Sequence, residues 1–386
     1  MTISMYAKRN KKARPGVALL VVLFIVMAIT VLSLGFVSRS DVELACGQNM
    51  ILRTEMDYLA ESGLEHARGL ILNPQDVGSE YWTGSTAQQL VAGSGNYYDL
   101  VVVRDDTDPT DRCNYIIDCN SYRLQGADTT GRSSVRATLR LDPCIAFWTG
   151  SSTTVSPQVT INGDVYCTGD LTNSGIIGGD VFATGTITGA NIEGQKQVVT
   201  EAPVAWPNLI RTDFGPTYYI GSTTYSAVIV DANHPAGTFN PTGANPAGIR
   251  YSNSDVNMPG NVNINGMLVV NGTLRISGLN NVITAGKNFP ALLVAGQVIM
   301  EDGGSLVIRG LAQIGGPITD DPNTANANIS VTGGLFIANG GVASDKIIVN
   351  ITAAPAIASI ETWSATGVPS RWRPAAGAFY RSIERK

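Results

Sequence analysis

The sequence predicts a mainly β protein with one long N-terminal α-helix, in which that helix and an antiparallel meander precede an irregular right-handed β-solenoid. Three observations predict this fold class. The first is an uncharged apolar run near the N-terminus, and the second is a set of three β-favouring runs separated by turn-rich stretches. The third is a glycine-rich, weakly charged region of about two hundred residues that contains an internal repeat.

Composition excludes several classes of protein. Of the 386 residues, 44% are hydrophobic and only 15% are charged, which is too apolar for a disordered chain and too poor in charge for a coiled coil. The net charge is −5, and the first sixteen residues hold five basic side chains and no acid, so the rest of the chain is more acidic still. No nucleic-acid partner is expected, because a phosphate backbone needs a positive surface. No cofactor is expected either, since no GxSxG, HExxH or Walker motif occurs.

The apolar run predicts that the chain is anchored in a membrane. Residues 17–38 contain no charged side chain, and as a helix they would be roughly 33 Å long at ~1.5 Å per residue, enough to span a bilayer. The positive-inside rule keeps the basic residues 1–16 in the cytoplasm and places the bulk of the chain outside, periplasmic or extracellular. We therefore expect a single-pass protein of the inner membrane. Its membrane helix would include Val17, Leu20, Phe24, Met27 and Leu34.

The helix is expected to continue to residue 72. Residues 39–72 contain no proline, and their apolar side chains recur mostly at steps of three and four, as on one face of a helix. Asn73 and Pro74 follow, and a proline disfavours helical geometry in the residue before it. One half of the helix 17–72 would lie in the membrane, and the other half would be a packing surface.

The residues around this helix resemble a known family. A basic leader ends in Gly16, the hydrophobic helix follows at once, and residues 41–49 (DVELACGQN) and 58–68 (YLAESGLEHAR) lie on its amphipathic continuation. Together these features resemble the PilX-type minor pilins of type IV pili and the large minor pseudopilins of type II secretion, over about residues 8–72. The resemblance implies that a prepilin peptidase cuts between Gly16 and Val17, and that other pilins or pseudopilins are partners. A plain signal anchor, which has the same hydropathy, is the alternative.

Two positions depart from the family pattern. In the family the residue after the cut is usually Phe or Met, whereas here it is Val17; major pilins carry a glutamate at the fifth mature position, where this chain has Val21. In a pilus core that carboxylate neutralises the terminal amine of a neighbouring subunit, so an apolar Val21 leaves the amine without its usual partner. The resemblance therefore implies a rare or tip subunit of a pilus or pseudopilus.

A pilin-like β-meander is expected over residues 73–143. Three runs rich in strand-forming residues would be its strands: residues 97–104, 114–124 and 133–141. Cys113 and Cys119 flank the middle strand and form a candidate disulfide in an exported protein. Within one straight strand they would be roughly 20 Å apart, so this pairing needs a bend, and Cys144 is the alternative partner. No CxxC pair or neighbouring histidine accompanies these thiols, so no metal site is expected.

Residues 144–350 form a different compositional region, which predicts a β-solenoid. They hold 29 of the 42 glycines but only 20 charged side chains. GDVYCTGDLT at residues 163–172 recurs sixteen positions later as GDVFATGTIT at residues 179–188. A repeat too short to bury its own apolar face must stack on its neighbours, which favours an irregular right-handed solenoid, with a β-sandwich as the alternative. Residues 195–260, rich in Pro, Asn, Thr and Tyr, would be an excursion between two sets of repeats.

The remaining residues, 351–386, combine tryptophans with several arginines. We expect this tail to cap the open end of the solenoid, whose last coil would otherwise expose strand edges. A docking patch for another subunit is the alternative.

No residue is expected to be catalytic. The carboxylates that a polysaccharide-cleaving β-helix could use are Asp164, Asp180, Asp302 and Asp320. An aspartate beside a glycine is usually a turn residue, however, and His66 and His234 are both expected to face solvent. The primary expectation is thus a noncatalytic subunit that displays its solenoid for adhesion or assembly, with a surface glycan or a protein as ligand. The alternative is a membrane-anchored surface β-helix protein that acts on or binds polysaccharide.

Overall fold

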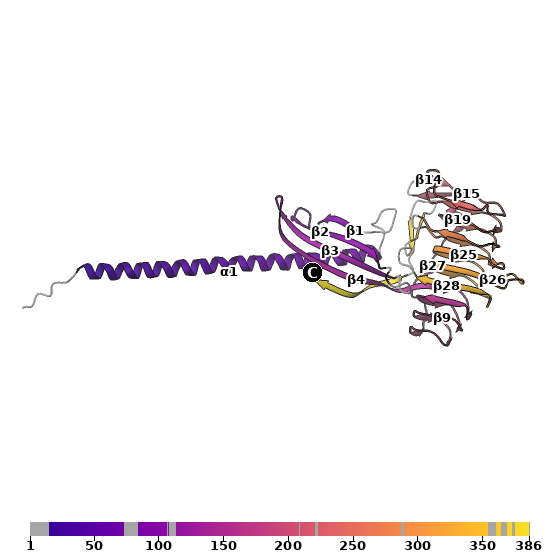
Figure 1. The fold of residues 1–386 in the computed structure, drawn as a ribbon, viewed down its shortest axis with the longest axis horizontal. Helices are drawn as coiled ribbons and strands as arrows, with labels where there is room; N and C mark the ends of the chain where they lie inside the picture. Colours follow the sequence, from indigo (N-terminus) through magenta and orange to yellow (C-terminus); the bar gives the residue numbers. More distant parts are fainter. Residues whose placement is uncertain are drawn as a thin grey trace, which may run out of the picture.

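The molecule has three parts that follow one another along its longest axis (Figure 1). They are an isolated stretch of helix, a head in which the rest of that helix packs on a small sheet, and a β-solenoid. The expected fold class is confirmed, with a solenoid of about ten turns. The computed structural model describes residues 15–72, 84–105, 107, 113–207, 209–220, 223–286, 289–353, 360–363, 369–372 and 375–385.

The head consists of one antiparallel sheet and the C-terminal half of the helix α1 (Pro15–Leu72). Its strands lie in the order β1-β2-β3-β4-β31. Their bounds are Gly84–Gln88, Asn96–Arg104, Asn114–Gln125, Asp128–Thr149 and Ala375–Arg385. The three strands expected from the sequence are β2, β3 and β4, and their antiparallel order is confirmed.

The helix packs on the sheet through residues spaced three and four apart, because these positions share one helix face. The buried side chains of this face are Met56, Leu59, Ala60, Leu64 and Ala67. The contact is close at Gly63, where any side chain would collide with the Cys119 thiol and the Tyr98 ring. Ser121 Oγ also donates a hydrogen bond of 2.7 Å to the main-chain oxygen of Met56, which fixes the helix along its axis.

The solenoid has three faces, which the chain visits in the order A, C, B in each coil. Face A is formed by β15 (Val228–Ile229), β17 (Ile249–Ser252), β20 (Met267–Val270), β23 (Leu292–Val294), the second parts of β25 (Ser305–Ile314) and β27 (Ala327–Ile337), the end of β4, β7 (Asp164–Cys167), β10 (Val181–Ala183) and β12 (Lys196–Val198). Face C is formed by β18 (Val256–Met258), β21 (Leu274–Ile276), β24 (Val298–Met300), β26 (Ile318–Asp320), β5 (Thr153–Val155), β8 (Leu171–Asn173) and β11 (Ile187–Gly189). Face B is formed by β16 (Gly237–Phe239), β19 (Val262–Asn265), β22 (Asn281–Thr284), the first parts of β25 and β27, β28 (Ile347–Ala353), β6 (Val159–Asn162) and β9 (Ile176–Ile177).

Aliphatic side chains from all three faces fill the interior. The sixteen-residue repeat is the spacing of two successive coils, since Val165 pairs in parallel register with Val181, and Leu171 with Ile187. Parallel stacking places like residues above one another, so each aliphatic column continues from coil to coil.

The chain joins the solenoid at its middle, not at an end. The last residues of β4 pair in parallel with β7 on one side and with β27 on the other. The repeats that follow β4 build coils away from it, whereas the C-terminal repeats start at the far end and build coils back toward it. Figure 1 shows the result, with β9 below the level at which β4 enters the solenoid and β19 and β15 above that level.

A segment that we call the strap, residues 199–227, connects the two sets of coils by crossing the outside of face A. It includes the short helix η2 (Arg211–Phe214) and the hairpin of β13 (Thr217–Ile220) and β14 (Thr223–Ser226). Its Trp206 packs against Trp148 of β4 with ring centroids 5.3 Å apart, and Phe214 packs against Phe289 at 5.9 Å. The strap therefore covers face A, which explains why all four residues of β7 and of β20 are buried. The expected excursion 195–260 thus comprises β12 of the first set, the strap and the first coils of the second set.

The candidate disulfide between Cys113 and Cys119 is wrong, and the alternative partner, Cys144, is the one that the structure shows. Cys113 is bonded to Cys144 of β4, with Cα atoms 6.6 Å apart, and Cys119 is a buried free thiol. The reason is that β3 continues without a bend from Asn114, so Cys119 lies far along the strand and faces α1, whereas Cys144 lies on the neighbouring strand.

The tail does not cap the solenoid through its last strand. β31 runs antiparallel to β4, from Ala375 opposite Cys144 to Arg385 opposite Val135, and forms an edge of the head sheet. An ion pair from Arg385 to Glu61 ties it to α1. The solenoid is therefore inserted between two neighbouring strands of the head. Of the rest of the tail, the structure describes a hairpin of β29 (Ile360–Trp363) and β30 (Pro369–Trp372), and residues 354–359 and 364–368 lie outside the described residues.

The cysteines should differ sharply in reactivity. Burial raises the pKa of Cys119 to about 12 and that of Cys167 to about 11, so almost no thiolate forms at neutral pH. In the full chain held in detergent micelles, iodoacetamide should modify the exposed Cys46 rapidly and the two buried thiols only after denaturation. Peptide mass mapping without reductant should yield Cys113 linked to Cys144. A peptide joining Cys113 to Cys119 would contradict the arrangement.

Candidate functional site: the exposed helix

The N-terminal half of α1 is exposed on all sides. Among the residues that the structure describes, α1 is the one helix long and apolar enough to cross a membrane, and its most apolar window is entirely unburied. Its uncharged run, residues 17–38, matches the ~30 Å thickness of a bilayer core. Together with the solenoid, this helix indicates a membrane-anchored surface β-helix protein.

The expected membrane residues all lie on this exposed stretch. Each is more than half exposed: Val17, Leu20, Phe24, Met27 and Leu34. α1 begins at Pro15, so the bond between Gly16 and Val17 lies in its first turn, and cleavage there stays a prediction. Val21 is exposed as well, and no carboxylate accompanies it between residues 17 and 38.

A second apolar feature continues beyond the membrane run. Val37, Leu44, Ile51 and Tyr58 recur at steps of seven residues and are 58–69% exposed. Because residues seven apart lie close together on a helix, these four side chains form one line, which we call the heptad stripe. At roughly 100° per residue the stripe points roughly 150° away from the helix face that packs on the head sheet. The head therefore leaves the heptad stripe uncovered.

A part of α1 lies between the membrane run and the head, and it belongs to neither of them. It covers residues 39–51, all of them exposed, and is roughly 20 Å long at ~1.5 Å per residue. An ion pair of 2.9 Å joins Arg39 to Glu43 here, but both side chains are largely exposed, so it stabilises the helix little. Leu44 and Ile51 of the heptad stripe thus lie outside the uncharged run, on a helix that its own chain does not cover.

The two histidines have structural surroundings, contrary to the expectation that both face solvent. His66 lies between helix and sheet, with Nδ1 2.9 Å from the Tyr98 hydroxyl. His234 is fully buried; its Nδ1 lies 2.9 Å from the Pro235 carbonyl oxygen, and its Nε2 accepts a hydrogen bond of 2.8 Å from Arg250. Burial lowers the pKa of His234, so the ring is neutral at pH 7. Its hydrogen bond with Arg250 of β17 helps to hold the first coils of the second set together.

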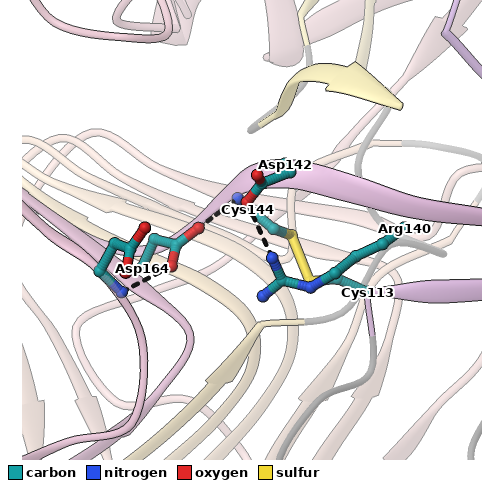
Figure 2. Close-up of a disulfide and its surroundings, with 6 residues drawn as sticks. Cys113, Arg140, Asp142, Cys144 and Asp164 are labelled. Carbon is teal, nitrogen blue, oxygen red and sulfur yellow. Dashed lines mark hydrogen bonds and ion pairs between the residues drawn. A yellow bond between two sulfur atoms is a disulfide. The ribbon is translucent and has the colours of Figure 1, made fainter. Parts of the chain in front are cut away.

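The acidic candidates Asp164 and Asp180 lie at one corner of the solenoid, on successive coils. Asp164 is buried and accepts hydrogen bonds from the main-chain N–H groups of Cys144 at 2.7 Å and Asp180 at 2.9 Å (Figure 2). Asp180 in turn accepts one from the N–H of Gln195 at 2.8 Å. Each carboxylate thus binds the backbone of a neighbouring coil, which is a turn-stabilising role.

Asp302 and Asp320 are far from that corner. Asp302 accepts hydrogen bonds from the N–H groups of Ala325 and Asn326, which hold its pKa below the usual value. Asp320 lies on face C and pairs with Lys346 at 3.4 Å. The four candidates therefore do not converge on one groove. Within the described residues, no three His, Cys, Asp or Glu side chains are placed to hold a metal ion.

Sequence reasoning missed the junction of head and solenoid, which Figure 2 shows. The Cys113–Cys144 disulfide joins the start of β3 to β4 at the point where β4 leaves the head. Arg140 and Asp142 of β4 form an ion pair of 2.8 Å beside it. Asp164, from the first coil after β4, bonds to the Cys144 N–H. A signal was present, since the β-favouring run from residue 133 continues to residue 149 with one proline as its single interruption.

Comparison of the chain with protein-family models, with curated proteins and with solved structures found no match. The resemblance to PilX-type minor pilins and pseudopilins therefore depends on the residues quoted for it.

Asp164 should be important for stability and not for turnover. Asp164→Ala leaves one buried and one partly buried N–H group without this acceptor, and should lower the free energy of unfolding by about 3 kcal/mol. Asp164→Asn keeps one good acceptor and should cost about half as much. Urea unfolding of the full chain in detergent would measure both. Asp170→Ala is the matched control, because Asp170 binds the next coil in the same way but is exposed, and should cost less. An unchanged unfolding midpoint for Asp164→Ala would contradict this role.

Proposed function

We propose that this protein is a noncatalytic minor pilin-like or pseudopilin-like subunit. α1 holds it in the inner membrane, a prepilin peptidase removes residues 1–16, and the mature helix then packs laterally into a pilus or secretion fibre. The head and the solenoid stay outside the fibre core, where the solenoid is displayed for adhesion or assembly.

The observation that carries this proposal is the heptad stripe. A plain anchor needs apolar side chains within the bilayer, but Leu44 and Ile51 lie past the charged residues Arg39, Asp41 and Glu43. Their exposure, together with the seven-residue spacing, is typical of a surface that packs against another helix. Neighbouring pilin-like helices would cover this line once the subunit leaves the membrane.

The shape of the molecule supports the same function. Figure 1 shows the solenoid at the end of the head opposite the exposed helix. A helix packed in a fibre would therefore leave all three solenoid faces outside it. The uncharged stretch around Val21 supports a rare or tip position, since a repeated shaft subunit would need a carboxylate for each terminal amine.

Processing can be tested at the predicted cleavage point. The protein recovered from cells should begin at Val17, and Gly16→Ala should keep the Met1 start and stay out of sheared fibres. Intact-mass measurement and fibre fractionation would show both. Gly35→Ala makes the same change in the same helix, at a position with open space around it, and should be processed normally. A wild-type protein that keeps its Met1 start argues for a plain anchor.

Helix packing can be tested separately. Leu44→Glu with Ile51→Glu places two charges on the heptad stripe, and should reduce recovery in fibres at least tenfold while membrane insertion and processing continue. Val42→Glu with Asn49→Glu is the control, because both side chains are exposed and are also seven residues apart, on the side of α1 that faces the head. Quantitative immunoblots of fibre and membrane fractions would compare the pairs. Equal recovery of both would rule out the heptad stripe as the assembly surface.

A further inference from the structure

Face B is the broad uncovered side of the solenoid. Its strand segments form one continuous parallel sheet in the order β16-β19-β22-β25-β27-β28-β6-β9. Figure 1 shows β19, β25, β27, β28 and β9 stacked in this order. Along β19, β6 and β28 buried residues alternate with partly or fully exposed ones, so one set of side chains points outward into open space. Face A, by contrast, lies under the strap.

The outward side chains of face B form regular columns, because parallel stacking places them one coil apart. One column carries hydroxyl and amide groups on nearly every coil, and we call it the amide–hydroxyl column. Its members are Asn240, Asn265, Thr284, Arg309, Thr332, Thr352 and Asn162. Asn265 donates a hydrogen bond of 2.6 Å to Asn240, so side chains of adjacent coils do line up.

The neighbouring column is partly apolar. Asn263, Val282, Val307, Ser330 and Asn350 follow one another in register across adjacent strands. The two valines lie side by side near the middle and are half-buried. They form a small apolar patch flanked by hydroxyl and amide groups.

Charge is sparse on the strands of this surface, although Arg140, Glu193 and Arg381 lie beside Asn162 and Ile176 at its end nearest the head. On the strand segments of face B, Arg309 is the one ionisable side chain among the residues described, in a chain with 31 acidic and 26 basic residues. The charges beside Asn162 are confined to one end and include both signs, so a charged polymer along the other coils would meet Arg309 alone and fits poorly. A β-strand from another protein fits poorly as well, because the inner strands of face B already use their backbone groups in the ladder and strand addition needs a free edge.

We infer that face B binds an uncharged polysaccharide that lies along the solenoid axis. Adjacent strands are ~4.8 Å apart, a spacing close to the length of one pyranose unit, so successive sugars would meet the same kind of side chain on each coil. The C–H faces of the sugars would lie on Val282 and Val307, and their hydroxyls would exchange hydrogen bonds with Thr284, Thr332 and Thr352. This inference rests on the proposed function only in that α1 places the solenoid outside the membrane.

The inference can be tested by affinity electrophoresis of the full chain in detergent micelles. Gels containing dextran, glucomannan or hydroxyethyl cellulose serve as neutral probes, and a gel containing alginate serves as the acidic probe. At least one neutral probe should retard the wild-type chain, and alginate should not. Thr332→Ala with Thr352→Ala should weaken this binding about tenfold, because two hydrogen-bonding hydroxyls are lost.

Thr154→Ala with Thr172→Ala provides the matched control. These two threonines are exposed on adjacent coils of face C, so the pair repeats the same chemical change on another side of the same solenoid. It should leave retardation unchanged, and urea unfolding should show that both double variants remain folded.

The inference is overturned if no neutral probe retards the chain, if alginate alone does, or if the two threonine pairs weaken binding equally. It is also overturned if sedimentation shows that the face B pair abolishes self-association instead, since face B would then receive a second copy of the chain. The outcome is separable from that of the fibre experiments. A chain with an uncleaved leader still carries face B, and a chain that assembles into fibres can still fail to bind glycan.

Discussion

The structure depends on one strand that belongs to two bodies. β4 pairs in antiparallel fashion with β3 and β31 in the head and then in parallel with β7 and β27 in the solenoid. β4 has a hydrogen-bonded strand on each of its two edges, both in the head and in the solenoid. The orientation of the solenoid relative to the head is therefore fixed without a flexible linker. The Cys113–Cys144 disulfide and the buried Asp164 lie at the point where β4 changes partners, and both hold the same residue: the disulfide holds the Cys144 side chain, and Asp164 accepts a hydrogen bond from the Cys144 main-chain N–H. The strap also follows from this constraint: a chain that joins a solenoid at its middle must cross its outside once to complete both halves.

Sequence patterns predicted the elements that depend on neighbours along the chain. α1 follows from an apolar run and from steps of three and four, and the sixteen-residue repeat gave the correct register of Val165 on Val181. The order of the coils was not predictable in this way, because every coil offers the same aliphatic residues to its neighbours. The pairing of Leu335 with Phe147 joins coils that are far apart in sequence, and any other coil would have matched the pattern equally well. The position of β31 was missed, and the partner of Cys113 was left open between Cys119 and Cys144, for the same reason, since both depend on which strands meet in space.

The features of the candidate site also differ in whether the sequence alone could predict them. The exposed apolar helix was visible in the sequence, as was the chance that Asp164 and Asp180 are turn residues. The heptad stripe was not recognised, because the same helix also carries the head-facing residues Met56, Ala60 and Leu64, and only the packed sheet shows which apolar side chains are covered and which are not. Surface geometry likewise distinguishes face B from face A: both consist of stacked short strands, yet the aromatic residues of the strap cover face A alone. What the molecule offers to partners is therefore decided by what its own chain leaves uncovered.

The insertion between β4 and β31 has a mechanical consequence. In the proposed fibre, a pull on α1 would put tension on the molecule whenever the solenoid is bound to a ligand. Figure 1 shows β4 running from the head into the solenoid in roughly the direction of α1, with β31 beside it. Tension would therefore run along these strands and load their ladder hydrogen bonds in shear, many at once, rather than peeling them apart one by one. The solenoid is thus attached near its middle through β4, with β31 beside it. The coils on either side of this junction would lie across the direction of the tension.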